Sequence, residues 1–429
     1  MGMVLTAEED YLWECGRAWR KPLPAQRAEG LDWDTVVAVG LKNRMQVLLA
    51  DVFTDTGVMA CLSPPAQAEL EMGVAKYRDN AARLGEDLRC YLRHAARREQ
   101  AVVVLKGLWL SLEIYRNAAM RPGSDIDVLL RRQDIAAALA ILEEEMGYGR
   151  WWRPLLDDLY YARHHLHQQR CNQDRSIWFE PHWALDHPYT RLTIDYDALM
   201  ARTTAGELWG EPVREMSLPD LLISLAVHLV KHAVYLPATI SRPDLPRLVL
   251  ADGMLMYFLD VAEIAKQYEN EIDWQLTVKL ARTGGVVDIL GSVLRVCRQY
   301  LAAPVPAWVL EALPVGRPGL VSHRLMQRLA EFKIATYQGQ KPGRLWTFLL
   351  GYNESIVFRP IRLLDLAHYC LPGADYLERR YGSASVVAAV GHLLRAMGQY
   401  ARVGFDTLYF SWRRRREVRA LDRSGFTWP

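Results

Sequence analysis

The chain has 429 residues, of which 51% are hydrophobic and 24% charged, and its formal net charge is +2. This length and composition are typical of a globular protein with two or three domains and a substantial core. The near-neutral charge gives no indication of a nucleic-acid or membrane partner. The six cysteines form no CxxC pair and no short-range cluster with histidine. That spacing argues against a disulfide framework or structural zinc site and favours a reducing, cytoplasmic location.

The first part of the chain has the pattern of helices. Residues 31–98 repeat apolar side chains at helical spacing, as in WDTVVAVGLKNRMQVLLADVF. Acidic residues precede any long apolar stretch, so a secretory signal is not expected. The longest apolar runs, such as LLISLAVHLV (221–230), are too short to span a bilayer.

The apolar pattern changes near residue 101. AVVVL (101–105) and IDVLL (126–130) predict two buried strands, and LWLSLEIYRN (108–117) between them predicts a helix. QDIAAALAILEEEMGYG predicts an amphipathic helix after the second strand. The alternating stretches YYARHHLHQQ and SIWFEPHWAL, separated by the turn-like CNQDR, predict a β-hairpin within residues 160–185.

Helical patterns return after about residue 190. SLPDLLISLAVHLVKHAV opens with Ser217-x-x-Asp220, which resembles a capping box, and the proline-rich LPATISRPDLPR (236–247) predicts a loop. The fold class predicted is therefore α+β, a small mixed β-sheet core with helical regions on both sides. The predicted parts are an N-terminal helical region (1–98), the α+β core (99–200), a helical substrate-side domain (201–315) and a C-terminal helical extension (316–429).

Two aspartates in RPGSDIDVLL suggest a metal site. Asp125 and Asp127 are one residue apart at the start of a predicted strand, so their side chains point to the same face. Two carboxylates about 7 Å apart repel each other unless a cation lies between them. Mg²⁺ commonly binds one or two carboxylates together with substrate phosphates, and Mn²⁺ is the alternative. The competing interpretation is the polar face of a surface strand, since such pairs also occur by chance.

A third carboxylate lies on the downstream strand. In IWFEPHW, Glu180 is the single acid on a face that it shares with Trp178 and His182. Three carboxylates on neighbouring strands can hold two metal ions about 3.5–4 Å apart, the arrangement used for in-line phosphoryl displacement. This pattern favours catalysis over a plain strand face.

These segments together resemble a known family. VVVLKG, RPGSDIDVLL and WFEPHWAL resemble the nucleotidyltransferase superfamily of the DNA polymerase β type. They are most similar to its bacterial uncharacterised nucleotidyltransferase family, in which LKG is followed by R-x-x-x-DIDLLV and an E-x-HW-x-L strand. The resemblance extends over residues 30–315 and includes HLVKHAV and YFLDVAEIA.

The resemblance implies a metal-dependent enzyme that moves a nucleoside monophosphate, with ATP as the expected donor, onto an acceptor hydroxyl and releases pyrophosphate. Asp125 and Asp127 would be metal ligands, and Glu180 a third ligand or the base for the hydroxyl. The acceptor stays open between a small molecule, a peptide and a protein. Two other functions also stay open: a non-catalytic module that binds a nucleotide or partner, and kinase-like transfer of the γ-phosphoryl group.

The resemblance also implies a phosphate site. Gly107 would let the backbone approach the triphosphate at the start of the following helix. The wider superfamily usually has Gly-Ser at this point, whereas this chain has Lys106-Gly107-Leu108, so Lys106 would replace a hydroxyl with a charge. Arg121 and Ser124 border the aspartates and would steady the phosphates.

Histidines near the predicted hairpin are further candidates. His165 and His167 in RHHLHQQ share one strand face, which would lie beside Glu180 and His182 if the hairpin forms as predicted. There they could contact the nucleotide or the acceptor. The alternative is a solvated polar face.

Three residues in the later helices are candidates for the substrate side. His228 and His232 in HLVKH are four residues apart, a spacing that can bind zinc, but the motif lacks the glutamate of a metalloprotease helix. Packed or hydrogen-bonded histidines are the more common explanation, as is a structural role for Asp260 in YFLDVAEIA. The basic SWRRRREVRALDR (411–423) is more typical of a solvated helix end than of a nucleic-acid site.

Overall fold

The computed structural model describes residues 5–18, 30–121, 123, 125–150, 165–186, 192–316, 320–339, 374–395 and 397. The chain forms two compact units, one of Met1–Trp152 with His165–Tyr352 and the other of Arg153–His164 with Asn353–Pro429. The second unit contains helix α20 (Ala374–Tyr381), and every other element named below belongs to the first. The four-part division expected from the sequence stays a prediction.

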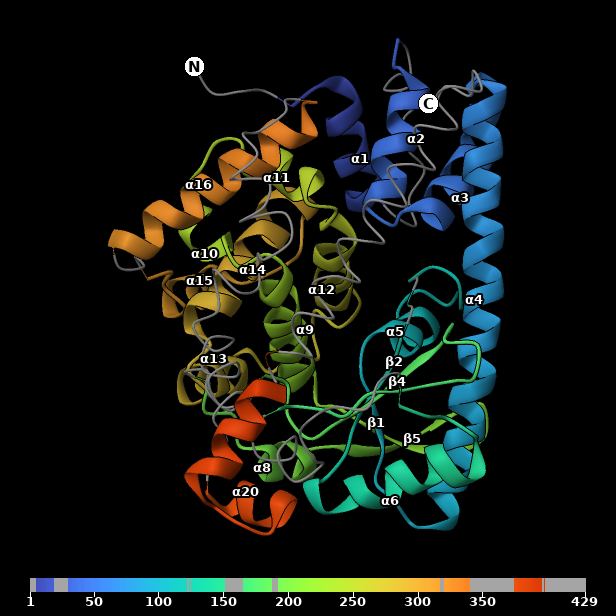
Figure 1. The fold of residues 1–429 in the computed structure, drawn as a ribbon. Helices are drawn as coiled ribbons and strands as arrows, with labels where there is room; N and C mark the ends of the chain where they lie inside the picture. The colour runs from blue at the N-terminus through green and yellow to red at the C-terminus, as the bar shows by residue number, and fades with distance from the viewer. Residues whose placement is uncertain are drawn as a thin grey trace. The chain divides into compact units, whose positions relative to one another are not determined.

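The first unit begins with helices. They are α1 (Ala7–Arg17), α2 (Trp33–Lys42), α3 (Gln46–Thr56), the short 3-10 helix η2 (Val58–Cys61) and α4 (Pro64–Arg97). The Ser63 hydroxyl accepts a hydrogen bond from the Ala66 N–H (3.3 Å), and Pro64 follows at a position where its missing N–H costs nothing. From there α4 runs past the N-terminal helices and along the sheet (Figure 1). Because it packs against both, it connects the N-terminal helices to the sheet.

A six-stranded mixed sheet forms the centre of the fold. Its strands are β1 (Val103–Val104), β2 (Asp125–Leu129), β3 (Arg170–Cys171), β4 (Trp178–His182), β5 (Thr204–Leu208) and β6 (Glu211–Glu215). The order is β3-β4-β2-β1-β6-β5, with β2–β4 and β1–β6 parallel and the other pairs antiparallel. The predicted α+β class with helical flanks is confirmed, and the sheet continues beyond residue 200 through β5 and β6.

Short helices connect these strands. They are α5 (Gly107–Glu113), the 3-10 turn η3 (Arg132–Asp134), α6 (Ile135–Ala140), the π-helical turn η4 (Ile141–Glu145) and α8 (Tyr196–Ala201). The predicted hairpin is confirmed for its described part, since β3 and β4 pair antiparallel and His167 forms a further bridge with His182. Residues 160–164 of that prediction lie outside the described residues. The strand predicted over 101–105 is shorter, since only Val103 and Val104 join the ladder.

The two faces of β4 have different surroundings. Phe179 is fully buried, with its ring 4.6 Å from Tyr91 of α4 and 6.1 Å from Tyr148. Because side chains alternate along a strand, Glu180 and His182 lie on the opposite face. Helix α4 therefore packs on one face of the sheet, and the acids lie on the opposite face.

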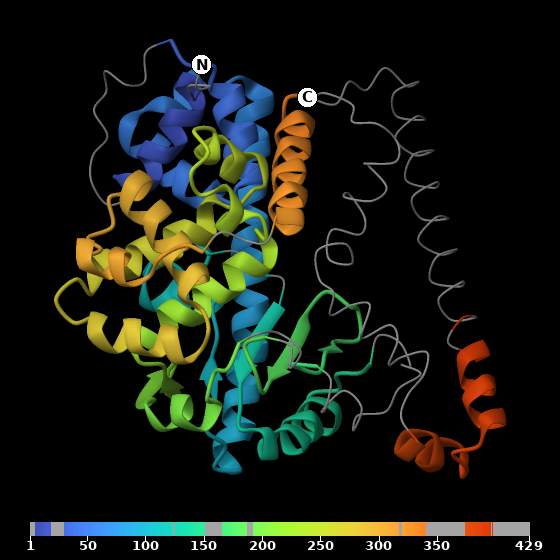
Figure 2. The same ribbon diagram turned by 90° about the vertical axis from the view of Figure 1, so that its left-hand side faces the viewer.

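Helices complete the first unit. They are α9 (Leu218–His232), α10 (Leu236–Thr239), α11 (Leu245–Ala251), α12 (Leu255–Gln267), α13 (Trp274–Thr283), α14 (Val287–Leu301), α15 (Ala307–Ala312) and α16 (Leu320–Tyr337). The mostly buried helices α9, α12 and α14 pack against one another, and α1 packs on α12 and α14, so the N-terminal helices lie beside this group (Figure 2). Within the described residues, no helix has the length and apolar character needed to cross a membrane.

The loop predicted over 236–247 is wrong at both ends and holds only for residues 240–244. This stretch contains α10 and the start of α11. Pro237 and Pro246 each lie in the first turn of one of these helices, where no intrahelical partner awaits the missing N–H. The prolines therefore begin helices here and do not interrupt them.

Candidate active site

Strand pairing brings the three predicted acids onto one face. In the parallel pair of β2 and β4, Asp127 is directly opposite Glu180 and Asp125 is opposite Trp178. Asp127 is 4% exposed, whereas the side chain of Asp125 retains 32% exposure. The acids thus form a group that is buried at Asp127 and open at Asp125.

Lys106 lies between the two aspartates. Its Nζ is 2.9 Å from Asp127 Oδ2 and 3.5 Å from Asp125 Oδ2. Burial lowers the pKa of Lys106, but the charges of the two aspartates outweigh burial and hold that pKa above its usual range. The ammonium therefore occupies the place where a cation between two carboxylates is expected.

The backbone around Lys106 explains how it reaches this place. Val104 of β1 pairs with Val128 of β2, and the Leu105 N–H donates to the Asp127 carbonyl (2.9 Å). Lys106 follows at a φ of +36° and a ψ of −154°, a sparsely populated backbone conformation that costs a non-glycine residue about 1–3 kcal/mol. The chain thus turns sharply at the end of β1 and places the lysine beside β2.

His182 binds the second oxygen of Asp127. Its Nε2 donates to Asp127 Oδ1 (3.0 Å) and lies 3.4 Å from Glu180 Oε2. Burial raises the pKa of Asp127, but Lys106 and His182 together hold it well below its usual range. Burial lowers the pKa of His182, and the hydrogen bonds to the two carboxylates raise it by more. Both carboxylate oxygens of Asp127 therefore have nitrogen partners, Lys106 and His182.

Glu180 has further partners on the hairpin. His167 Nε2 lies 3.8 Å from Glu180 Oε2, and the rings of His167 and His182 are 4.7 Å apart. Burial lowers the pKa of His167 to about 3 despite the nearby carboxylate, so this imidazole is neutral at pH 7. The Gln169 side-chain amide donates to the other Glu180 oxygen. His165 lies two residues before His167, on the segment that leads into β3.

The donor set fits a divalent cation. Asp127, Glu180 and His182 each offer one ligand atom, and these atoms lie within 4.8 Å of one another. Carboxylate oxygens suit Mg²⁺ and Mn²⁺, and an imidazole nitrogen adds a donor that Mn²⁺ also accepts. The Nδ1 atoms of His167 and His182 are buried and have no hydrogen-bond partner among the described residues, so the rings retain unused polar atoms. Asp125 is linked to this group through Lys106.

Arg121 and Asp260 lie together in a separate buried group. Arg121 Nε donates to Asp260 Oδ2 (2.6 Å), and the Tyr115 hydroxyl donates to Asp260 Oδ1 (2.8 Å). Arg121 is 5% exposed and Asp260 1% exposed. The pair ties the segment before β2 to helix α12, and its contact with phosphate stays a prediction. Ser124, the other residue predicted to contact phosphate, lies outside the described residues.

The two histidines of α9 face α12. The rings of His228 and His232 are 4.9 Å apart, and each lies near the ring of Tyr257, at 5.5 Å and 5.6 Å. Burial lowers the pKa of His228 well below its usual range, and the charge of Lys106 lowers it further. Among the described residues, the groups of potential metal ligands include neither histidine. Their place on the substrate side stays a prediction.

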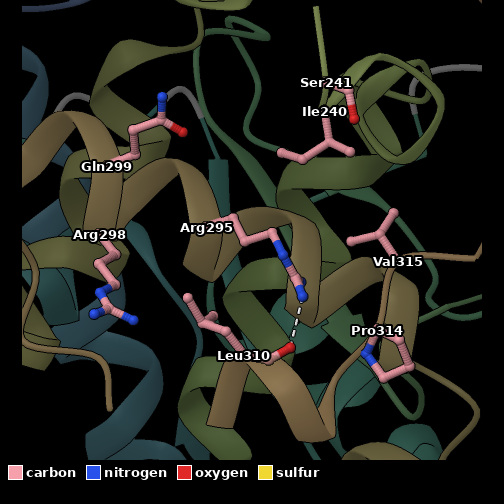
Figure 3. A pocket seen from close by; sticks show the side chains of 8 residues that line it. All are labelled: Ile240, Ser241, Arg295, Arg298, Gln299, Leu310, Pro314 and Val315. Atoms are coloured by element: carbon pink, nitrogen blue, oxygen red, sulfur yellow. Dashed lines mark hydrogen bonds between the residues drawn. The ribbon is translucent and has the colours of Figure 1, made fainter. Parts of the chain in front are cut away.

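A cavity of about 660 Å³ lies between α14, α15 and the end of α10 (Figure 3). Arg295 reaches across it and donates to the carbonyl oxygens of Leu310 (2.5 Å), Leu313 (2.8 Å) and Gly291 (2.9 Å). The bonds to Leu310 and Leu313 join α14 to the end of α15, and the three bonds together occupy the guanidinium. The lining residues include none of those predicted to act; they are Ile240, Ser241, Arg295, Arg298, Gln299, Leu310, Pro314 and Val315.

Comparison with known proteins identifies the family. Residues 29–302 match the profile of a family described as an uncharacterised nucleotidyltransferase, a match that covers more than half of the chain. The chain belongs to this nucleotidyltransferase family. Searches of curated proteins and of solved structures found no match.

The matched range of this nucleotidyltransferase contains the sheet, the three acids and the α9–α12 group. The family assignment makes the chain a transferase of nucleotidyl groups and confirms the resemblance seen in its motifs. The bacterial origin and the wider DNA polymerase β-type superfamily remain predictions.

Sequence patterns missed several residues that the fold brings near the site. Gln169 contacts Glu180, while Tyr115 and Tyr257 surround the Arg121–Asp260 pair. Only the alternation of the hairpin, which puts Gln169 on the same face as His167, contained a signal for one of them. Tyr115 follows α5 and Tyr257 lies in α12, and no local pattern specifies how these segments pack.

Proposed function

We propose that this nucleotidyltransferase moves a nucleoside monophosphate, from ATP as the donor, onto an acceptor hydroxyl and releases pyrophosphate. The observation that carries the proposal is the register that sets Asp127 opposite Glu180, with Lys106 between Asp127 and Asp125. Perturbed carboxylates gathered with a lysine and a histidine are characteristic of functional sites. The family assignment supplies the class of reaction.

The proposed reaction is an in-line displacement at phosphorus. The acceptor oxygen forms a bond to the α-phosphorus, and the bond from that phosphorus to the β-bridging oxygen breaks, so pyrophosphate leaves with the electron pair. Glu180 takes the hydroxyl proton, and Gln169 and His167 hold its carboxylate in position. Asp127 and His182, two of the three donors that lie within 4.8 Å of one another, would hold Mg²⁺ or Mn²⁺ together with Asp125, which leaves the third donor, Glu180, to act as the base. Such a cation stabilises negative charge on the attacking and leaving oxygens.

Lys106 and Gly107 form the proposed phosphate contact. Gly107 has a φ of +49° and no atom within 4 Å of the position where a Cβ would stand, so the backbone here is accessible to a ligand. The Lys106 ammonium neutralises the aspartates when no nucleotide is bound. A triphosphate would offer it new anionic partners at the same site.

One observation favours the runner-up, a non-catalytic binding module. Both oxygens of Asp127 already have partners, Lys106 and His182, at 2.9 Å and 3.0 Å. In such a module these partners would persist and nucleotide binding would need no divalent cation. Metal dependence therefore separates the two functions.

The first test is a calorimetric titration with a non-hydrolysable α,β-analogue of ATP, with and without Mg²⁺. Wild type should bind the analogue only with the cation. Asp127→Asn should weaken this binding at least tenfold, because a neutral amide is a poorer ligand. Glu144→Gln, which removes an exposed acid of η4, is the matched control and should bind as wild type does. Metal-dependent binding that survives in Asp127→Asn would contradict the assignment.

The second test follows the phosphorus. ATP labelled at the α- or the γ-position is incubated with the protein and with small-molecule, peptide and protein fractions. Transfer of the α-label with release of pyrophosphate supports the proposal. Transfer of the γ-label with formation of ADP would establish the kinase-like alternative.

A further inference from the structure

The turn between α2 and α3 is fastened firmly to α12. Asn43 in this turn is fully buried, and its amide donates to the carbonyl oxygens of Val39 and Leu250, both at 3.0 Å. The same side chain accepts a hydrogen bond from the Leu255 N–H (3.0 Å). One asparagine thus joins the turn to the corner between α11 and α12.

Close backbone contact fixes the turn further. A Cβ on Gly253 would lie 2.7 Å from the Lys42 carbonyl oxygen, so only glycine fits at this corner. Arg44, next to Asn43, has a φ of +61°, which costs a non-glycine residue about 1–2 kcal/mol. Strained residues persist where the surrounding structure determines them, and they concentrate at functional sites.

This strained turn holds Arg44 against Tyr257. The guanidinium lies 5.2 Å from the centre of the Tyr257 ring, and that of Arg121 lies 4.5 Å from it. His228 stacks on the same ring at 5.5 Å with an interplanar angle of 26°, and His232 lies at 5.6 Å. Two guanidinium groups and two imidazoles therefore surround one buried aromatic ring.

The two arginines differ in their charge partners. Arg121 is neutralised by Asp260 at 2.6 Å. In the described part of the chain, the guanidinium of Arg44 has no ion pair and no hydrogen bond, and the residue is exposed. A cation–π contact orients Arg44 without cancelling its charge. The group therefore presents one uncompensated positive charge to solvent.

A second observation at this place indicates a ligand. Gln46, two residues after Arg44, is 7% exposed, and its buried Oε1 has no hydrogen-bond partner among the described residues. Burial raises the pKa of Tyr77, while a hydrogen bond from the Gln46 side chain and the charge of Arg44 lower it, so the polar contact of Gln46 with Tyr77 leaves its Oε1 unused. A buried acceptor that has no partner in the protein commonly accepts a hydrogen bond from a ligand or a water.

Arg121 connects this group to the segment that carries the acids. Arg121 precedes Asp125 by four residues, and the Ser111 hydroxyl of α5 bonds to the backbone N–H and carbonyl of Arg121 (3.1 Å and 3.2 Å). Helix α5 begins directly after Lys106. The pKa of His228, which stacks on Tyr257, is lowered by the charge of Lys106 and raised by the charge of Asp127. Through Tyr257 and Arg121, the Arg44 turn is thus connected to the strand that carries Asp125 and Asp127.

We propose that Arg44, Tyr257 and Gln46 form an oxyanion subsite next to the active site. Arg44 binds a phosphate or carboxylate group, Tyr257 orients the guanidinium, and Gln46 accepts a hydrogen bond from an N–H or O–H of the same ligand. The oxyanion belongs either to the acceptor or to the phosphate tail of the nucleotide. That role in transfer rests on the proposed function, whereas anion binding by Arg44 does not.

The test uses inorganic phosphate and pyrophosphate as probes, and ³¹P NMR titration measures their binding. EDTA is present throughout, so that no divalent cation contributes. Wild type should bind both, and Arg44→Gln should weaken binding at least tenfold, whereas Arg44→Lys should retain part of it. Arg89→Gln removes an exposed arginine of α4 and is the matched control, with binding expected to equal that of wild type. Thermal unfolding checks that each variant is folded.

A second arm identifies the source of the anion. Phosphate that still binds wild type in the presence of Mg²⁺ and a saturating non-hydrolysable ATP analogue assigns the subsite to the acceptor. Phosphate displaced by the analogue assigns it to the nucleotide. Equal binding by wild type and Arg44→Gln, or no binding by wild type, overturns the subsite. Asp127→Asn should keep the metal-free binding, so failure of the proposed function and failure of the subsite are distinguishable.

Discussion

Three acids and two basic side chains lie close together on one face of the sheet. Asp125, Asp127 and Glu180 carry the negative charges, and Lys106 and His182 lie within 2.9–3.5 Å of their oxygens. Buried charges are tolerated only when they are paired and hydrogen-bonded. The paired arrangement therefore stabilises the site without a bound ligand. It also means that a cation entering the site competes with Lys106.

Lys106→Met tests this competition. The substitution leaves buried Asp127 without its closest cation, so the free energy of unfolding should fall by about 3–5 kcal/mol in EDTA. A divalent cation can then take the vacant place, and millimolar Mn²⁺ should restore much of the loss. Urea unfolding with and without Mn²⁺ measures both effects.

Lys266→Met is the matched control for that experiment. Lys266 pairs with buried Glu263 at 2.8 Å, away from the sheet, so its loss should destabilise the protein without recovery in Mn²⁺. An equal response of the two variants to the cation would show that Lys106 does not occupy a cation site.

The lowered pKa of His167 should make the stability of the protein depend on pH. Burial lowers its pKa to about 3, against about 6.5 in an unfolded chain, so between these values the unfolded state binds more protons. Stability attributable to this residue is therefore present above pH 6.5 and is lost as the pH falls. Between pH 7 and pH 5.5 wild type should lose about 1 kcal/mol more than His167→Gln, measured by urea unfolding. Parallel pH profiles would contradict this expectation.

Among the elements, the pairing of β2 with β4 and the α2–α3 turn decide which side chains meet. A one-residue slip between β2 and β4 would turn Glu180 to the face where Phe179 now packs on α4. The Tyr91–Phe179 contact thus stabilises the β2–β4 register in which the three acids lie on one face. The α2–α3 turn has the same function for Arg44, because Asn43 and Gly253 leave it no other position.

Gly253→Ala tests the close approach at that turn. Its Cβ would meet the Lys42 carbonyl oxygen at 2.7 Å at a φ of +71°, so we expect a loss of about 2–4 kcal/mol in the free energy of unfolding. Gly57→Ala is the control, since Gly57 has a φ of +75° with nothing within 4 Å and should lose only about 1 kcal/mol. Equal losses, measured by chemical unfolding, would show that the close approach is not tight.

Across the first unit, the helices before the sheet and those after it form a common core. Glu9 of α1 binds Arg247 of α11 at 2.7 Å, and both residues are buried. Arg17 at the end of α1 donates to the Tyr300 carbonyl of α14 (3.2 Å). The regions predicted as separate helical parts on either side of the sheet are thus joined by contacts across more than 200 residues of sequence.

Much of the site could be predicted because its signals are local. The alternation of a strand places Asp125 and Asp127 on one face, a short apolar run predicts β2, and alternating stretches predict the hairpin. The motifs around Lys106 and Glu180 identify the family. Each of these depends on residues only a few positions apart. They were therefore readable without knowledge of the fold.

The sequence by itself determined the α+β class, the placement of the three acids on one face of neighbouring strands, and the nucleotidyltransferase family. Only the tertiary structure decided that Lys106 binds the aspartates, that Arg121 pairs with Asp260, and that Arg44 rests on Tyr257. The physical reason is that charge pairing and ring contacts are non-local. Their partners lie up to 213 positions apart, and packing of the helices, not local periodicity, brings them together.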